Sequence, residues 1–200
     1  MSSAVDFWFD FSSPYGYLAA EQIDSLAARH GREVRWRAIL LGPLFKVVGT
    51  APLTTLPVKG DYAAHDFART ARLLGIPFAL PNPFPVATQV AARAFYLVQD
   101  EGTAKAKQFA RLAYRAYFAE GRDITNTSVV LDLVAAAGAD ASTVAPHLGG
   151  DAIKQRVRDE VDLALRAGVF GSPFFKVDGE PFWGNDRLPH LEEWLRRGGW

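Results

Sequence analysis

The chain has 200 residues, of which 49% are hydrophobic, and its 22 basic and 22 acidic residues cancel to a formal net charge of zero. This size and composition predict one large domain, or a domain with a substantial insertion. The balanced charge provides no field that would attract nucleic acid or an anionic membrane surface. Cysteine is absent, which excludes disulfides, thiolate metal sites and thiol redox chemistry by the chain alone.

No targeting or membrane segment is expected. Residues 1–4 carry no basic region and strand-like sequence follows at once, unlike a signal peptide. No apolar run approaches the length of a membrane span. A cytoplasmic location is therefore the expectation.

The N-terminal part predicts a β-α-β unit. Residues 5–11 are rich in Val and aromatic side chains and predict a buried strand. Ser13 suits the N-cap and Pro14 the first position of a helix that continues to about residue 30. Residues 34–41 predict a second strand, and a right-handed crossover makes the two strands parallel.

Helical patterns fill the middle of the chain, separated by Pro or Gly breaks and by a proline-rich loop at residues 75–85. The predicted helices are 61–75, 87–102, 104–120, 128–138 and 151–168. Residues 173–177 and 180–183 then predict a β-hairpin around the two-residue turn Asp178-Gly179. Residues 188–197 predict a closing helix.

This order of elements predicts the fold class. A β-α-β half, a helical block and a β-β-α half are typical of a thioredoxin-like α/β fold, with a large helical insertion in its mixed sheet. We expect residues 1–41 and 169–200 to form the thioredoxin-like domain. Residues 42–168 are expected to form the helical insertion domain with its linking segments.

The junction between the first strand and the first helix is the first candidate site. A helix N-terminus exposes unpaired N–H groups and a partial positive charge, which stabilise an anion. Thioredoxin-type proteins place a C-x-x-C motif here, where the helix end lowers the thiol pKa. This chain instead has Ser13-Pro14-Tyr15-Gly16. A thiolate used at this junction must therefore arrive with a ligand.

Two interpretations fit Ser13: a helix cap and nothing more, or a hydrogen-bond donor to a ligand thiolate. A free thiol has a pKa of roughly 8.5, and one pKa unit corresponds to about 1.4 kcal/mol. The helix end contributes ~0.3–1 kcal/mol, and up to ~2 kcal/mol when partly buried. A hydrogen bond to a charged group adds about 1.5–3 kcal/mol. After desolvation, these effects lower a ligand thiol pKa by about one to two units.

Three further motifs each have a structural and a functional interpretation. Gly171-Ser172-Pro173 fits a loop entering a strand, or a cis-proline whose preceding backbone pairs with a peptide ligand. Asn185 and Asp186 fit helix capping, or recognition of a ligand ammonium group. Lys59 and Tyr62 are either solvated or contact a ligand carboxylate. Another set of side chains either lines an apolar pocket or packs in the core: Trp36, Trp183, Phe45, Phe84 and Phe182.

No metal site is expected, because the four histidines are scattered without metal-ligand spacing. No nucleotide-binding glycine motif and no serine-hydrolase motif is present.

The segments FDFSSPYGYLA, LPVKGDY, GVFGSPFF and FWGNDRL together resemble the 2-hydroxychromene-2-carboxylate isomerases and the related kappa-class glutathione transferases. The resemblance spans nearly the whole chain in order and with matching spacing. It implies a thioredoxin fold with a helical insertion, glutathione as cofactor and a homodimer. Two departures stand out: residues 49–55 match a glutathione-contacting loop poorly, and Gly16 stands where relatives often have Ser.

The resemblance also implies roles for individual residues. Ser13 corresponds to the catalytic serine beside the glutathione sulfur. Ser172, next to Pro173, is implied to pair with the cysteinyl backbone of glutathione. Asn185 and Asp186 are implied to contact the γ-glutamyl group, and Lys59 is implied to approach the glycyl end.

The implied reaction interconverts 2-hydroxychromene-2-carboxylate and trans-o-hydroxybenzylidenepyruvate, which requires rotation about a carbon–carbon double bond. Reversible addition of a thiolate makes that bond temporarily single, so glutathione is a recycled nucleophile. Two alternatives remain: a kappa-type transferase that conjugates glutathione to an electrophile, and a cysteine-free thioredoxin-like binding module. A disulfide oxidoreductase is excluded, because no residue here can form the mixed disulfide.

Overall fold

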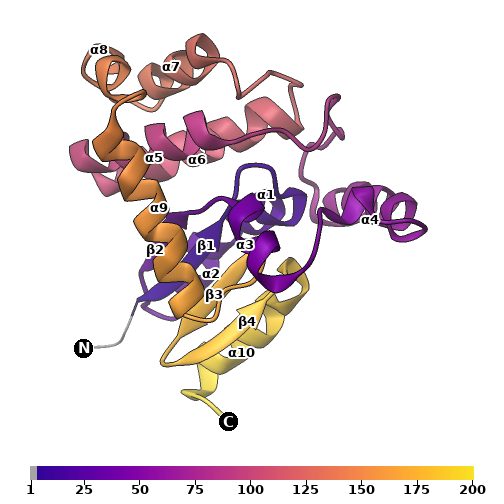
Figure 1. Ribbon diagram of the computed structural model, residues 1–200. Coiled ribbons are helices and arrows are strands. Elements are labelled where there is room, and N and C mark those ends of the chain that lie inside the picture. Colours follow the sequence, from indigo (N-terminus) through magenta and orange to yellow (C-terminus); the bar gives the residue numbers. More distant parts are fainter. Residues whose placement is uncertain (1–3) are drawn as a thin grey trace.

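The computed structural model describes residues 4–200 and shows a twisted sheet covered by helices on both faces (Figure 1). Residues 1–3, which belong to the segment where no signal peptide is expected, lie outside the described residues. Within residues 4–200, no helix combines the length and the apolar character needed to cross a membrane.

The elements follow the predicted order. They are β1 (Val5–Phe9), α1 (Pro14–Ala20), α2 (Ile23–Arg29), β2 (Val34–Ala38), α3 (Leu41–Val48), η1 (Leu53–Thr55), α4 (Lys59–Leu74), α5 (Gln89–Glu101), α6 (Thr103–Phe118), α7 (Thr127–Ala136), α8 (Ala141–Val144), η2 (Ala145–His147), α9 (Asp151–Arg166), β3 (Phe174–Val177), β4 (Glu180–Trp183), η3 (Asn185–Arg187) and α10 (Leu188–Arg197), where η marks a short 3₁₀ helix.

The strands form one mixed sheet in the order β2-β1-β3-β4. β1 pairs with β2 in parallel and with β3 in antiparallel orientation, and β3 pairs with β4 in antiparallel orientation. Asp178 and Gly179 both have positive φ, at 54° and 92°, as a two-residue hairpin turn requires. The thioredoxin-like fold with helices inserted between its two halves is therefore confirmed.

Three predicted boundaries are wrong. The strand predicted at 5–11 ends at Phe9, and the strand predicted at 34–41 ends at Ala38, after which α3 begins at Leu41. The helix predicted from Pro14 to about residue 30 is two helices that break around Gln22. The Gln22 side-chain amide donates to the Leu18 carbonyl at 2.8 Å and so occupies the acceptor that a continuing helix would use.

One row of aromatic side chains joins the sheet to the inserted helices. Phe7 packs against Trp36 of β2 and Phe175 of β3, with ring centroids 5.0 and 5.2 Å apart. Phe9 extends the row to Phe95 of α5 at 5.4 Å and to α6. The buried cluster therefore contains residues of both the sheet and the insertion. The division into residues 1–41 with 169–200 and residues 42–168 stays a prediction.

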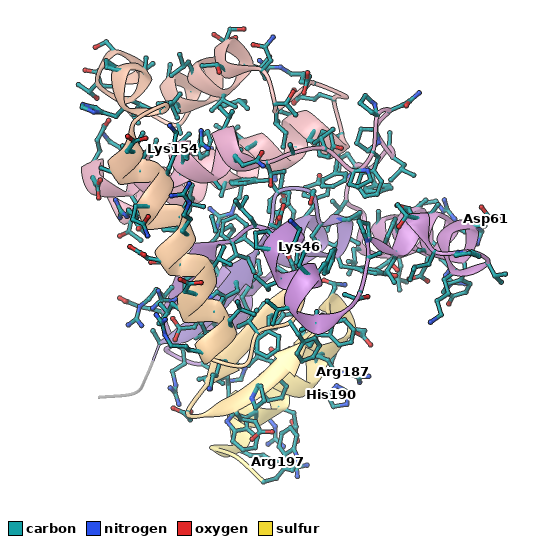
Figure 2. All side chains as sticks on the ribbon, in the orientation of Figure 1. Lys46, Asp61, Lys154, Arg187, His190 and Arg197 are labelled. Atoms are coloured by element: carbon teal, nitrogen blue, oxygen red, sulfur yellow. The ribbon has the colours of Figure 1, made fainter. Side chains whose placement is uncertain are left out.

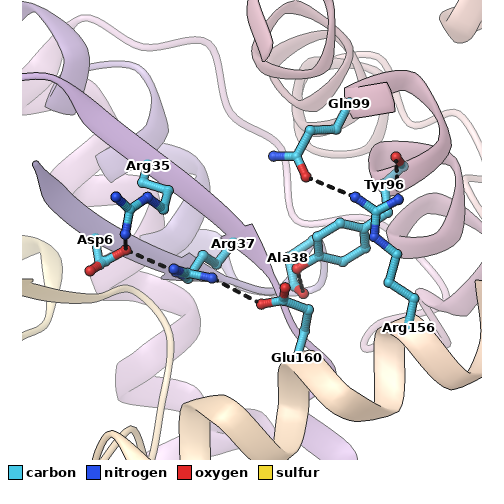
Figure 3. Close-up of polar contacts among 8 residues, drawn as sticks. All are labelled: Asp6, Arg35, Arg37, Ala38, Tyr96, Gln99, Arg156 and Glu160. Atoms are coloured by element: carbon cyan, nitrogen blue, oxygen red, sulfur yellow. Dashed lines mark hydrogen bonds and ion pairs between the residues drawn. The ribbon is translucent and has the colours of Figure 1, made fainter. Parts of the chain in front are cut away.

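Polar contacts fix α9 and α5 to the edge strand β2 (Figure 3). Arg37 of β2 donates to Asp6 of β1 at 2.8 Å and to Glu160 of α9 at 3.2 Å. The Tyr96 hydroxyl of α5 donates to the Ala38 carbonyl at 2.7 Å, and the guanidinium of Arg156 lies over the Tyr96 ring at 5.0 Å. These contacts cover a strand edge that is otherwise free to pair with another chain.

Tyr17 gives the fold a measurable dependence on alkaline pH. Burial raises the pKa of Tyr17 to about 12, whereas a tyrosine in the unfolded chain titrates near ~10. Between these values the unfolded chain loses the proton first, so the free energy of unfolding falls as the pH rises. We expect Tyr17→Phe to make this fall shallower in urea titrations, and to cost about 1 kcal/mol at neutral pH because the Pro77 carbonyl loses its donor. Equal slopes for both proteins would contradict this interpretation.

Candidate active site

A cavity of about 850 Å³ opens beyond the end of β1. This volume lies in the upper part of the range typical of small-molecule sites. Its walls come from parts of the chain that are far apart in the sequence: residues 12–15, α3, residues 50–54, α4, residues 84–85, residues 170–173 and residues 183–187. The cavity therefore exists only when the two halves of the fold and the inserted helices are assembled.

Ser13 lies at one end of this cavity and caps α1. Its side-chain oxygen accepts from the Gly16 N–H at 3.0 Å, and its hydroxyl donates to the Ser172 carbonyl at 2.9 Å. The residue is buried, with an exposed fraction of 5%. The hydroxyl proton is already engaged, so donation to a ligand sulfur requires that it leave the Ser172 carbonyl.

Ser172 lies directly opposite Ser13, and the Ser172–Pro173 bond is cis. The Ser172 hydroxyl accepts from the Asp10 N–H at 3.0 Å. The backbone N–H of Ser172 has no hydrogen-bond acceptor within residues 4–200. The backbone N–H of Tyr15, at the start of α1, has none there either. The cavity wall thus carries two free backbone donors beside the Ser13 hydroxyl.

Asn185 and Asp186 line the same cavity. Neither side chain caps α10, because no side-chain hydrogen bond closes the N-terminus of that helix; the capping interpretation is wrong. Asn185 accepts from Gln22 at 3.2 Å, which orients its amide. Asp186 is exposed and pairs with Arg187 at 3.4 Å. Arg187 lies beside His190 at the outer edge of this region (Figure 2).

Lys59 does not lie with the other predicted site residues. It is the exposed first residue of α4 and is absent from the cavity lining, as is Tyr62, whose hydroxyl accepts from Arg69 at 3.0 Å. Asp61, two residues after Lys59, marks the outer end of α4, which projects away from the sheet (Figure 2).

Other residues of α4 reach the cavity instead. Asp66, Phe67 and Thr70 line it, and Asp66 accepts a hydrogen bond from the Tyr15 hydroxyl. Burial is the largest cause that raises the pKa of Tyr15, and the hydrogen bond to Asp66 is the second. The phenol therefore remains protonated. The sequence prediction missed this pair because the contact joins residues 51 positions apart.

Asp10 is a second residue that the sequence prediction missed. The residue is 2% exposed, and its carboxylate accepts from Ser12, Leu41 and Thr88. Burial raises the pKa of Asp10, and these hydrogen bonds offset part of that effect. The signal available in the sequence is an Asp that interrupts an aromatic run two residues before a Ser, the pattern of a side-chain-to-backbone turn.

The apolar wall combines three of the five aromatic residues that the sequence pointed to. Phe45, Phe84 and Trp183 line the cavity, whereas Trp36 and Phe182 are buried in the core. Trp183 packs on Phe170, with ring centroids 4.8 Å apart. Residues 50–54, which match the expected glutathione-contacting loop poorly, also form part of this wall.

Gly16 is required by close packing beneath the site. A Cβ atom at this position would lie 2.6 Å from the Tyr114 hydroxyl and 3.0 Å from the Ser172 hydroxyl. The Tyr114 hydroxyl is held in place by donation to the Asp10 carbonyl at 2.9 Å. A serine at residue 16 would therefore need Tyr114 to move.

We expect Gly16→Ala to lower the free energy of unfolding by about 1–3 kcal/mol, as overpacking does elsewhere. Adding Tyr114→Phe removes the closest atom, so the double variant should lose less stability than the sum of the single changes. Urea denaturation of all four proteins measures this coupling. If the stability losses of the two single variants simply add in the double variant, the Tyr114 hydroxyl is not what requires glycine at residue 16.

Comparison with known proteins places the chain in a family. Residues 4–196 match the family model of the DSBA-like thioredoxin domain. The 2-hydroxychromene-2-carboxylate isomerase of Pseudomonas putida is 32% identical over 195 residues, which are 96% of this chain and 94% of that protein. The chain belongs to this isomerase family, within the DsbA-like thioredoxin proteins.

Two further relatives agree with this assignment. A solved structure of 2-hydroxychromene-2-carboxylate isomerase superposes with a TM-score of 0.88 at 32% identity, covering 97% of this chain and 95% of that one. Glutathione S-transferase kappa 1 of Rattus norvegicus is 24% identical over 96% of this chain and 92% of that protein. The resemblance derived from the sequence motifs is thus confirmed, and the protein is an isomerase by family.

Proposed function

We propose that this member of the isomerase family is a glutathione-dependent cis-trans isomerase. It interconverts 2-hydroxychromene-2-carboxylate and trans-o-hydroxybenzylidenepyruvate in aromatic hydrocarbon catabolism. One observation carries the proposal: the Ser13 hydroxyl and the backbone of Ser172 meet at one end of a largely apolar cavity.

The residues at this end of the cavity fit glutathione. The backbone N–H and C=O of Ser172 offer a donor and an acceptor to a peptide ligand in the manner of an added strand. Asn185 and Asp186 provide an amide and a carboxylate for the γ-glutamyl group, on the same cavity wall. When bound, glutathione supplies the nucleophilic thiol that this cysteine-free chain lacks.

Ser13 then has a specific role as a donor to the thiolate. Its single hydroxyl hydrogen leaves the Ser172 carbonyl, which accepts from the amide of the bound peptide instead. The oxygen of Ser13 keeps the Gly16 N–H throughout, so the side chain stays anchored while its hydrogen changes acceptor. The apolar wall of Phe45, Phe84 and Trp183 holds the aromatic part of the substrate.

Three further assignments belong to the same proposal. Lys59 is assigned to the glycyl carboxylate on the family resemblance alone. It is exposed at the start of α4 and does not line the cavity. The protein acts as a homodimer, and it acts in the cytoplasm. The relationship to glutathione transferases of the kappa class supports glutathione as the cofactor.

A kappa-type transferase is the principal alternative. The two activities share the cofactor site and differ in the fate of glutathione, which a transferase consumes and an isomerase returns. Consumption of glutathione with chlorodinitrobenzene, without turnover of hydroxychromene carboxylate, would favour the transferase. Failure to bind glutathione at millimolar concentration in calorimetry would favour a binding module.

Ser13→Ala tests the proposal directly. We expect kcat for isomerisation in the presence of glutathione to fall about ten- to hundredfold, because a hydrogen bond to a charged group contributes about 1.5–3 kcal/mol. The change also removes the α1 cap, which costs about 0.5–2 kcal/mol of stability.

Asn126→Ala is the matched control. Asn126 caps α7 by the same kind of side-chain bond, to the Ser128 N–H at 2.9 Å, and it lies outside the cavity lining. It should lose similar stability and keep full turnover. Unchanged turnover in Ser13→Ala would remove this residue from the mechanism.

A further inference from the structure

The buried carboxylate of Asp10 contacts two separate segments that line the cavity. Asp10 follows β1, and its Oδ1 accepts from the Ser12 N–H at 2.8 Å, the Ser12 hydroxyl at 2.9 Å and the Thr88 hydroxyl at 2.9 Å. Its Oδ2 accepts from the Leu41 N–H at 2.6 Å. Both carboxylate oxygens are therefore engaged, and by backbone groups on different segments.

The contacts of Oδ1 and of the Asp10 backbone place the catalytic end of the cavity. The bond to Ser12 closes a turn that delivers Ser13 to the start of α1, where the Ser13 N–H donates to the Asp10 carbonyl at 2.9 Å. The Asp10 N–H donates to the Ser172 hydroxyl at 3.0 Å. Ser13 and Ser172 are thus both held against the same residue.

The contact of Oδ2 places the part of the cavity lining that α3 contributes. Leu41 is the first residue of α3, and no side chain of the preceding residue caps that helix. Leu41, Phe45 and Val48 follow one another along one face of α3 and line the cavity. Of the α3 residues only Leu44 is buried, so the helix has little other anchorage in the core.

We propose that Asp10 is a positioning residue for isomerisation: its carboxylate fixes the apolar wall of α3 at a set distance from Ser13. The inference rests on the proposed function, because it assigns α3 to the aromatic substrate and Ser13 to the thiol. Asp10 itself does not line the cavity and acts through Leu41 and Ser12.

Asp10→Asn tests the proposal with a minimal change of shape. The Ser12 and Leu41 N–H groups bond to different oxygens, and an amide has only one oxygen, so one backbone donor loses its acceptor in either orientation. We expect kcat to fall about 100-fold, the order seen when reacting groups are misplaced by about 1 Å. The affinity for glutathione, measured by calorimetry, should change little.

Thr88→Val is the matched control. It removes one hydroxyl donor to the same carboxylate but leaves both backbone contacts in place, so kcat should stay near that of the wild type. A merely structural role of Asp10 would lower the melting temperature and the folded fraction while leaving kcat per folded molecule and KM unchanged. That result would overturn the proposal.

Hydrogen exchange of the wild type tests the contact without any variant. The first N–H of a helix has no acceptor within the helix, and Thr103, in the equivalent position of α6, is exposed. We expect the Leu41 amide to exchange far more slowly than that of Thr103. Equally fast exchange would overturn the proposal even if Asp10→Asn failed to fold. Absence of isomerase activity in the wild type would instead overturn the proposed function. Hydrogen exchange would still measure the bond from the Leu41 N–H to Asp10 in that case.

Discussion

The hydrogen bond from the Ser13 hydroxyl to the Ser172 carbonyl is the contact that brings the two parts of the site together before a ligand binds. It joins residues 159 positions apart at 2.9 Å, and so ties the β-α-β half of the fold to the β-β-α half beside the cavity. The same serine caps α1. A single side chain thus caps the start of α1, joins the two halves of the fold and lines the cavity. The capping interpretation of Ser13 is confirmed, and its role as a donor to a ligand thiolate stays a prediction.

The aromatic row on the sheet explains how this contact is held. Phe7, Phe9 and Trp36 are buried and pack against one another. Phe9 also contacts aromatic side chains of α5 and α6. The inserted helices therefore share the core that supports the end of β1. Tyr114 of α6 lies under Gly16 and bonds to the Asp10 carbonyl. The insertion therefore shapes the cavity both by lining it and by supporting its floor.

Features governed by local sequence could be predicted from the sequence. Ser13 before Pro14 marked the start of α1, Asp178-Gly179 marked the hairpin, and the helical periods of α4 to α7 and α9 marked those helices to within a few residues. The thioredoxin-like order followed from these elements. The family motifs then pointed to Ser172, Asn185 and Asp186, which the cavity brings together with Ser13.

Features governed by contacts distant in sequence could not be predicted. α3 begins where the Asp10 carboxylate accepts the Leu41 N–H, a tertiary contact that no local pattern around residue 41 encodes. The break around Gln22 depends on its side chain bonding both Leu18 and Asn185. The part of α4 that lines the cavity contains Asp66 and Thr70 and not Lys59, its first residue. The motif around Lys59 could not indicate this, because the cavity is also formed by contacts distant in sequence.

In the proposed mechanism the protein provides the environment and bound glutathione provides the nucleophile. This division of roles can be tested by titrating the glutathione thiol in the complex and following the ultraviolet absorbance of the thiolate. We expect the pKa of the bound thiol to lie about one to two units below the ~8.5 of a free thiol. A bound thiol that titrates at or above the free value would contradict it.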